Sequence, residues 1–396
     1  MQNVVLEQKN DGAKWAATGV RFTHSDRQYT AHVKGEIIIC AGSVQSPQVL
    51  ELSGIGKPDI LKAAGIASKV ENSNVGENLQ DHMSRVLSLL STISFANPVV
   101  VTMMIYELDP STITPEALRS DPSLAAAADE QYHNLKTGPR TAAGYCVAYL
   151  PFTHYTTKEE ISRLAAQLPS TEPETRRRRD QLLSERFSSL EQSGQIEFLF
   201  EVSNYSAYFA SEPGKRYGTM MQMLQHPFSV GSIHIPPSAS PEDKPTTSDD
   251  KPVINPRFCE GAGGQVDFLT IAAAQHFGHK ICSTKPLADI IVKRMFPPIP
   301  EDGVNPSTED YTSWVRDTCV ADWHPVGTCA MGGDEGIKGG VVDDRLRVYG
   351  VTGLRVCDAS IIPLHIAAHP QATVYAIGEK GADMIKEEWV AMRDGA

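Results

Sequence analysis

The sequence predicts a mixed α/β fold with an α+β middle part, and three patterns along its 396 residues lead to this prediction. A continuous apolar run at Glu36–Cys40 is followed by small residues and then by a helical pattern, the order expected of a strand, a turn and a helix. Segments typical of strands recur in the middle of the chain, at 196–200, 219–224 and 231–235. A short strand at Leu354–Asp358 precedes a last helical pattern. A chain of this length forms two domains, or one domain with a large insertion.

The composition is that of a globular protein and excludes several classes of function. Apolar residues make up 41% of the chain, which allows a sizeable buried core. The formal net charge is −12, so the chain lacks the basic face that nucleic-acid binding needs. No window comes near the roughly 18 apolar residues that a membrane span requires, and we expect none. The N-terminus, Met1–Gln8, lacks the pattern of a signal peptide, so the default expectation for the chain as given is a cytoplasmic location.

Seven cysteines are scattered along the chain, at positions 40, 146, 259, 282, 319, 329 and 357. Their odd number and wide spacing do not fit a disulfide framework. Because none of them forms a C-x-x-C pair, the sequence predicts no zinc site, and we expect no bound metal from it.

The N-terminal part is predicted to be a meander of short strands. Strand patterns occur at Val4–Leu6, Ala17–Phe22, Thr30–Val33 and Glu36–Ile39, with polar turns between them. The chain therefore enters directly into a sheet. A nucleotide-binding domain ordinarily starts with a βαβ unit instead.

The sharpest local pattern in this half is the strand, turn and helix that starts at Glu36. Ala41–Ser43 follows the buried strand directly, and Ser46 and Pro47 are predicted as the N-cap and the first helical position. Ser53–Gly56 is predicted to end the helix. Small residues before a helix N-terminus let a ligand approach backbone N–H groups, and the helix dipole favours a negative group there. A tight connection without a ligand fits this pattern equally well.

Five segments of the chain stand out as motifs, at Ala41–Gly56, Val75–His82, Trp323–Gly332, Asp358–Ser360 and His369–Thr373. Together they resemble motifs of the glucose-methanol-choline (GMC) flavin oxidoreductase family. The first two resemble its second signature and the segment that follows it, and the other three, a loop, a strand end and a helix start, resemble its C-terminal active-site and flavin motifs. Each motif alone would be weak, but the matches occur in the family's order over nearly the whole chain.

The resemblance implies an incomplete, Rossmann-like FAD-binding domain together with a substrate domain built on an antiparallel sheet. We expect the first segment of the FAD-binding domain at 1–90, the substrate-binding domain at 91–305, and the C-terminal FAD-binding segment with the catalytic histidines at 306–396. A full-length member carries a G-x-G-x-x-G fingerprint for the FAD pyrophosphate near its N-terminus, and this sequence has none. The parallel sheet is therefore expected to lack strands and to have exposed edges.

Two histidines are the expected catalytic residues. Oxidation of an alcohol requires removal of the hydroxyl proton as hydride leaves the carbon, and a neutral imidazole suits that base role at physiological pH. The resemblance assigns the general base to His324, which stands in a Trp-His-Pro context. It gives His369 the task of binding the substrate oxygen and holding it near the flavin.

The resemblance also implies flavin contacts at three points. Ala41 and Gly42 belong to the turn before the first helix, and Asp358 and Ala359 end a strand where the family has backbone and carboxylate contacts to the flavin. A turn or cap role is the alternative for the aspartate. The third point is the start of the last helix, at Pro370, Gln371, Ala372 and Thr373. A helix N-terminus there would stabilise negative charge on a reduced flavin.

The implied function is FAD-dependent oxidation of a small-molecule alcohol to a carbonyl, in a biosynthetic pathway and of the aryl-alcohol oxidase-like kind. Because the fingerprint is missing, the sequence is expected to be truncated at its N-terminus, with a component of a split enzyme as the alternative. In both cases its partner would be an N-terminal FAD-binding portion. An inactive family member without flavin is a third alternative. A non-redox cyclase or lyase that uses His324 and His369 as acid and base is the alternative from another class.

Overall fold

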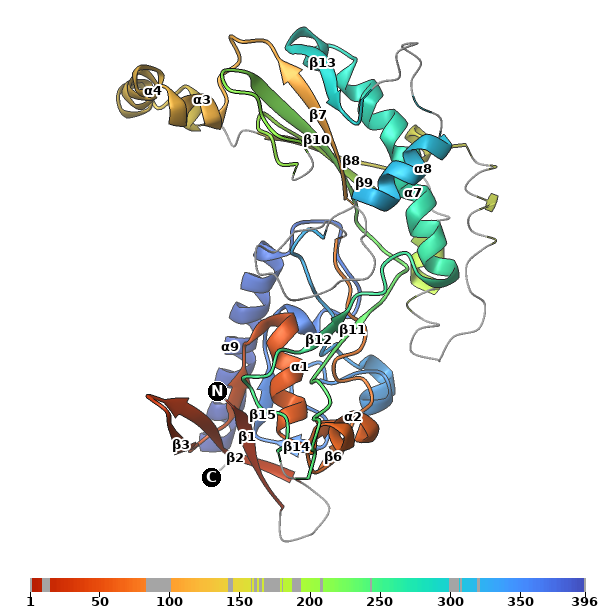
Figure 1. The fold of residues 1–396 in the computed structure, drawn as a ribbon. Coiled ribbons are helices and arrows are strands. Elements are labelled where there is room, and N and C mark those ends of the chain that lie inside the picture. Colours follow the sequence, from red (N-terminus) through yellow and green to blue (C-terminus); the bar gives the residue numbers. More distant parts are fainter. Residues whose placement is uncertain are drawn as a thin grey trace.

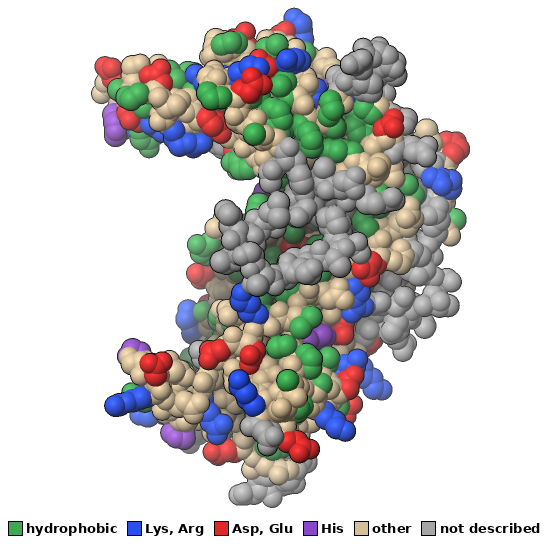
Figure 2. Space-filling model, viewed as in Figure 1, with side chains coloured by type: hydrophobic (Ala, Val, Ile, Leu, Met, Phe, Trp, Pro, Cys, Tyr) green, Lys and Arg blue, Asp and Glu red, His purple; other side chains and the backbone are tan. Residues whose placement is uncertain are grey.

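The computed structural model describes residues 2–8, 15–82, 101–141, 145–157, 159, 162–163, 166, 179, 181–186, 194–206, 209–242, 244–298, 306, 308–318 and 321–394. These residues form two lobes, and both chain ends lie in the lower lobe of Figure 1. A broad hollow separates the lower lobe from an arm of the upper lobe, formed by α3 (Pro115–Ser120) and α4 (Pro122–Leu135) (Figure 2). None of the described helices is long and apolar enough to cross a membrane.

The lower lobe begins with the predicted meander. β1 (Asn3–Gln8), β2 (Trp15–His24) and β3 (Arg27–His32) pair antiparallel in chain order. A strand from the other end of the chain, β14 (Val351–Thr352), joins this sheet and runs parallel to β2. The sheet thus combines sequence neighbours with a segment that local patterns do not connect to them.

The buried strand predicted before the first helix is β4 (Ile37–Ile39), which pairs in parallel with β15 (Leu354–Val356). Ile37 and Ile39 are buried, whereas Ile38 is 41% exposed. Among the described residues, β15 is the only strand that pairs with β4. The expected gaps in this parallel sheet stay a prediction.

The first helix, α1 (Gly42–Leu52), begins earlier than predicted. Its N-cap is Ala41, so the prediction of Ser46 as the N-cap is wrong, and Pro47 lies inside the helix and not at its first position. Gly42 has φ +76°, a conformation that glycine adopts at little cost, and this lets the helix begin directly after β4.

Pro47 is tolerated inside α1 because another group donates the hydrogen bond that the proline cannot donate. A proline has no N–H for the carbonyl four residues earlier, here that of Ser43. The Thr328 hydroxyl donates to this carbonyl at 2.7 Å. The Ser43 hydroxyl in turn donates to the Pro325 carbonyl at 2.7 Å. The start of α1 is thereby fastened to the loop that carries His324.

Several short elements complete the lower lobe, namely β5 (Ile55–Gly56), α2 (Pro58–Ala63), β6 (Val70–Glu71), β11 (Ser232–His234) and β12 (Val253–Asn255). The long last helix, α9 (Gln371–Asp394), packs Ile377 and Met384 against the apolar core of this lobe. The core contains Ile39 and Val356 from the parallel pair, so α9 and the two strands share one buried interior.

The upper lobe is built on the predicted antiparallel sheet. Its strands pair in the order β13 (Ile291–Phe296), β7 (Val101–Leu108), β10 (Arg216–Leu224), β9 (Ile196–Glu201) and β8 (Tyr145–Leu150). α7 (Gly261–Cys282) packs against this sheet and α8 (Thr308–Thr318) against α7 (Figure 1). Phe198 from the sheet, Phe268 from α7 and Val315 from α8 lie in one core. The fold class predicted from the sequence is confirmed.

Short 3-10 turns complete the described secondary structure, at η1 (Pro139–Thr141), η2 (Phe152–His154), η3 (Leu287–Asp289), η4 (Gly333–Lys338) and η5 (Ala359–Ile361). The predicted domain boundaries, at 90/91 and 305/306, fall within or beside the segments 83–100 and 299–305, which lie outside the described residues. These boundaries stay predictions.

Candidate active site

The two predicted catalytic histidines lie side by side. The rings of His324 and His369 meet edge to face, with their centroids 4.8 Å apart. Two further histidines complete what we call the histidine cluster. Nδ1 of His82 lies 3.1 Å from Nδ1 of His324, and the ring of His365 stacks on that of His82 with centroids 3.6 Å apart. The sequence did not predict these two as site residues, although His82 ends one of the motifs that carried the resemblance.

The backbone around His324 is held on both sides. The Asp81 carboxylate accepts the His324 N–H at 2.9 Å, and the backbone groups of Gln80 and Val326 bond to each other in both directions. Nε2 of His365 donates to the His324 carbonyl at 2.8 Å. Burial raises the pKa of Asp81 well above its ordinary value, against the opposing effect of the His324 N–H. The His324 side chain is thus presented from a fixed backbone.

The hydrogen bonds of His82 determine its tautomer. Nε2 lies 2.8 Å from the carbonyl oxygen of Ile366, which can only accept, so Nε2 carries the hydrogen. The residue is completely buried, and burial lowers the pKa of His82 well below its ordinary value, with His365 and His324 acting in the same direction. His82 is therefore neutral at physiological pH and has a lone pair on Nδ1.

The lone pair of His82 in turn determines the tautomer of His324. Because Nδ1 of His82 can only accept, Nδ1 of His324 donates across the 3.1 Å between them. A carboxylate oxygen of Asp322, 3.1 Å from the same nitrogen, also favours a hydrogen there. In the neutral ring, Nε2 of His324 keeps the lone pair. Nε2 is therefore the atom that can take a proton from a substrate.

His369 is oriented by an acid from the upper lobe. Its Nε2 lies 3.0 Å from Oε1 of Glu197, and this hydrogen bond raises the pKa of His369 above its ordinary value. Glu197 is completely buried in β9, and Gln225 donates to its other oxygen at 3.1 Å. Sequence reasoning missed Glu197. The available signal was an acidic residue inside the apolar run Ile196–Phe200, because a buried carboxylate needs partners.

The carboxylate of Asp358 accepts hydrogen bonds from protein groups on both of its oxygens. Its oxygens accept from the Gly42 N–H at 3.0 Å, the Ser46 hydroxyl at 2.6 Å, and the N–H and hydroxyl of Ser360 at 2.8 and 2.6 Å. A carboxylate has about four acceptor sites, and these donors occupy them. The side chain thus joins the end of β15 to the start of α1, which is a cap role. Its contact to a flavin stays a prediction.

The other residues predicted near the end of β15 and the start of α1 leave room for a ligand. Ala41 is the N-cap of α1, and Ala359 begins the turn η5. A Cβ added to Gly42 would meet no atom within 4 Å, so the backbone at this residue faces open space. A group bound there could approach the main chain closely, which fits the predicted flavin contact.

The remaining predicted flavin contacts lie at the start of α9. Pro370 is buried directly before the helix, Gln371 and Ala372 are exposed, and Thr373 is half-buried. An accessible helix N-terminus next to His369 fits a ring system that gains negative charge. The groups present therefore fit the ring end of FAD. A fingerprint for its pyrophosphate does not occur in the sequence.

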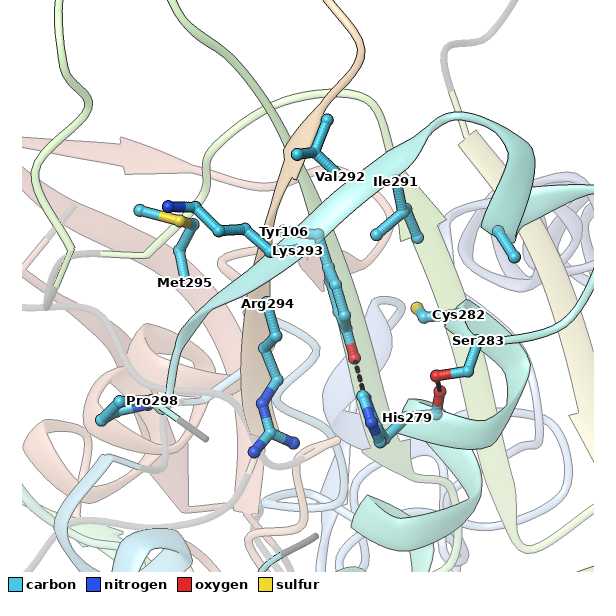
Figure 3. Close-up of a pocket in the computed structure, with 11 residues that line it drawn as sticks. Tyr106, His279, Cys282, Ser283, Ile291, Val292, Lys293, Arg294, Met295 and Pro298 are labelled. Carbon is cyan, nitrogen blue, oxygen red and sulfur yellow. Dashed lines mark hydrogen bonds between the residues drawn. The ribbon is translucent and has the colours of Figure 1, made fainter. Parts of the chain in front are cut away.

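A pocket of about 650 Å³ lies elsewhere, in the upper lobe (Figure 3). The Tyr106 hydroxyl and Nδ1 of His279 face each other there, 3.0 Å apart. Tyr106 pairs with Gly218 near the start of β10, whereas Glu197 pairs with Met223 near its end. This pocket is therefore separate from the histidine cluster. No residue of the histidine cluster lines this pocket, so its size does not make it the candidate reaction site.

Comparison with known families identifies the chain. Family models described as GMC oxidoreductase match residues 1–84, with the N-terminal model, and 227–378, with the C-terminal model. This chain belongs to the GMC oxidoreductase family. The two matched segments make up more than half of the chain and contain all four residues of the histidine cluster, so the resemblance seen in the sequence is confirmed.

Relatives of this GMC oxidoreductase family member are longer proteins. Dehydrogenase citC of Monascus ruber is 30% identical over 97% of this chain, which spans 59% of that relative. The structure of a FAD-dependent oxidoreductase from Chaetomium thermophilum matches 98% of this chain and 60% of its own, with a TM-score of 0.74 and 20% identity. A fungal aryl-alcohol oxidase structure matches the same shares, with a TM-score of 0.72 and 25% identity. The predicted fold is confirmed by these structures.

Proposed function

We propose that this chain carries the catalytic residues of a FAD-dependent oxidoreductase that converts a small-molecule alcohol, of the aryl-alcohol class, into a carbonyl compound. Membership of the GMC family and the likeness to an aryl-alcohol oxidase support the class of reaction. One observation carries the assignment of residues. The hydrogen-bond chain from the Ile366 carbonyl through His82 to His324 leaves the lone pair of His324 on Nε2.

His324 is the base in this proposal. Its Nε2 takes the hydroxyl proton as the substrate carbon loses hydride, and bound FAD supplies the acceptor for that hydride. The ring then has hydrogens on both nitrogens and a positive charge. Asp322, with a carboxylate oxygen 3.1 Å from Nδ1 of His324, stabilises this charge. The proton therefore moves from a substrate oxygen to Nε2 of His324, and Asp322 stabilises the protonated ring.

His369 holds the substrate oxygen. Glu197 binds Nε2 of His369 and so directs the ring and leaves Nδ1 for the substrate. With a proton on both nitrogens, Nδ1 donates to the oxygen on which negative charge develops, and positions it beside the base. The main chain at Ala41 and Gly42, Ala359, and the first turn of α9 at Pro370–Thr373 would hold the ring end of FAD.

The test starts from the purified 396-residue chain incubated with FAD. We expect the flavin to stay with the protein on gel filtration and to bleach when a benzylic alcohol is added without oxygen. His324→Gln should keep the flavin and slow bleaching by about 10²–10⁴-fold, since a general base contributes about that much. His133→Gln, at an exposed position on α4, is the matched control and should bleach at the unaltered rate.

Two results would contradict the proposal. A folded but colourless protein would show that this chain does not hold FAD. A flavin-containing protein that converts a substrate without net oxidation and without bleaching would favour a cyclase or lyase that uses the two histidines as acid and base.

A further inference from the structure

Three side chains next to the proposed base have the spacing of a metal-ligand set. Nδ1 of His82, Nδ1 of His324 and a carboxylate oxygen of Asp322 all lie within 4.8 Å of one another. Nδ1 of His324 is 3.1 Å from each of the other two atoms. Ligand atoms on a tetrahedral zinc ion lie about 3.3 Å apart, because each is about 2.0 Å from the metal. Two of the three separations are therefore close to the spacing in a tetrahedral zinc site, and the third, between His82 and Asp322, is at most 4.8 Å.

The structure holds these ligands in place before any ion binds. The Asp322 N–H donates to the His82 carbonyl at 2.7 Å, which ties the two ligand segments together. The His324 N–H is held by Asp81. His82 donates Nε2–H to the Ile366 carbonyl at 2.8 Å. Metal-binding histidines ordinarily donate their other ring N–H to such a carbonyl, which leaves the opposite nitrogen for the metal.

Asp322 provides an observation that is independent of the spacing. Its Oδ2 is buried and accepts no hydrogen bond from the described residues. Nδ1 of His324 is close to this oxygen, but its hydrogen is directed at His82. A buried acceptor without a donor is unfavourable, and a carboxylate oxygen is a good metal ligand. A cation between Asp322 and the two histidines would satisfy this oxygen.

We propose that His82, Asp322 and His324 form a binding site for a divalent transition-metal ion such as zinc, with the remaining coordination positions open to water. Two imidazoles and one carboxylate suit Zn²⁺, Co²⁺, Ni²⁺ or Cu²⁺ better than Mg²⁺ or Ca²⁺, which prefer oxygen ligands. The sequence predicted no metal because closely spaced cysteines were the available signal. Here His82 and His324 are 242 positions apart in the chain.

Metal binding at this site switches off the base, a consequence that rests on the proposed function of His324. A metal ion on Nδ1 of His324 takes the lone pair of that atom, so the hydrogen of the neutral ring moves to Nε2. Nε2 is then no longer able to accept a proton from a substrate. Zinc therefore inhibits the FAD-loaded chain, and removal of zinc by a chelator restores it.

The first experiment measures binding alone. The chain is freed of metal with a chelator and titrated with Co²⁺, whose visible d–d absorption reports low-coordinate binding to histidine. We expect bands that saturate at one equivalent and disappear when Zn²⁺ is added. Asp322→Asn, which is nearly isosteric, and His82→Asn should each weaken Co²⁺ affinity by at least about tenfold. His133→Asn removes an exposed histidine and should change nothing.

The results separate this proposal from the proposed function. The absence of d–d bands, or bands of equal affinity in Asp322→Asn and His82→Asn with circular dichroism unchanged, would overturn the metal site. Co²⁺ binding that both variants weaken, without inhibition of alcohol-dependent bleaching by Zn²⁺, would support the site and overturn the role of His324 Nε2 as base.

Discussion

The two lobes of this molecule are held together in different ways. In the lower lobe, segments from opposite ends of the chain pair directly, as β14 does with β2 and β15 with β4. The side chain of Asp358 reinforces this with its bonds to the start of α1. In the upper lobe, the strands come from the middle of the chain and meet α7 and α8 around an apolar core. The lower lobe thus joins distant parts of the sequence by strand pairing and polar contacts around its own apolar core, whereas the upper lobe is built from the middle of the chain.

The candidate active site divides between the lobes in the same unequal way. The lower lobe supplies the loops that hold the histidine cluster and the network that determines the tautomer of His324. The upper lobe adds the buried carboxylate of Glu197, which orients His369. Among the described residues, the groups that hold His324 therefore belong to the lower lobe, whereas the upper lobe supplies the carboxylate that orients His369.

The largest effect is expected where the chain ends meet. Asp358→Asn replaces one carboxylate oxygen, which accepts two hydrogen bonds, with an NH2 group, which can accept none. Hydrogen bonds to a charged group are each worth about 1.5–3 kcal/mol, so the free energy of unfolding should fall by about 3 kcal/mol. Urea denaturation followed by circular dichroism measures this. Asp59→Asn, at an exposed position, is the control and should change stability by less than about 0.5 kcal/mol.

The next effect concerns the ion pairs that join β11 to α1 and its neighbouring loop. His234 lies 2.7 Å from Glu51 and 3.3 Å from Glu77. Burial alone would lower the pKa of His234, but the two acids outweigh it and raise the pKa to about 9. Burial raises the pKa of Glu51, whereas that of Glu77 is lowered by His234 against the effect of burial, so a negative charge stays beside the ring.

The sign of the pH dependence follows from that raised pKa. The unfolded chain has a histidine pKa near 6.5, so the stabilisation is fully present below about pH 6.5 and is lost as pH rises through the folded pKa of about 9. The loss should be roughly 2 kcal/mol. Urea denaturation at a series of pH values measures it. His234→Gln should remove the dependence, and a wild-type protein equally stable across this range would contradict the assignment.

A smaller effect tests the contribution of the upper lobe to the site. Glu197→Gln removes the charge that binds Nε2 of His369, so the pKa of His369 should fall toward its ordinary value. If the less well oriented ring of His369 raises the activation free energy by about 1 kcal/mol, kcat of the FAD-loaded chain should fall roughly fivefold. NMR titration of the histidine signals and the rate of flavin bleaching give the two readouts. An unchanged pKa of His369 would show that the two lobes are not coupled here.

The smallest effect concerns Pro47 inside α1. Thr328→Val removes the hydroxyl that serves the Ser43 carbonyl and should cost about 1 kcal/mol. In a Pro47→Ala background the alanine N–H can reach the same carbonyl, so Thr328→Val should cost less there. A double-mutant cycle by urea denaturation measures the difference. Equal costs in both backgrounds would mean that Thr328 does not compensate for the proline.

The sequence by itself determined the features that depend on short stretches of residues. The buried strand at Glu36–Cys40, the antiparallel middle sheet and the roles expected of His324 and His369 all followed from local patterns or from motifs in the family's order. Their outcome differs. The fold and the family are confirmed, whereas the catalytic and flavin-binding residues stay proposals that the geometry of the cluster supports.

Only the tertiary structure decided which distant groups meet. The N-cap of α1 is Ala41 and not the predicted Ser46. Pro47 can lie inside this helix because Thr328 donates the hydrogen bond that the proline cannot donate. The tertiary structure also brought Glu197 to His369, and His82 to His324 across 242 positions of sequence. A local pattern indicates which residues favour a strand or a helix, but it does not indicate which distant donor will bond to a buried acceptor. The tautomer of His324 and the metal-ligand set both depend on such partners, which the chain acquires only when it folds.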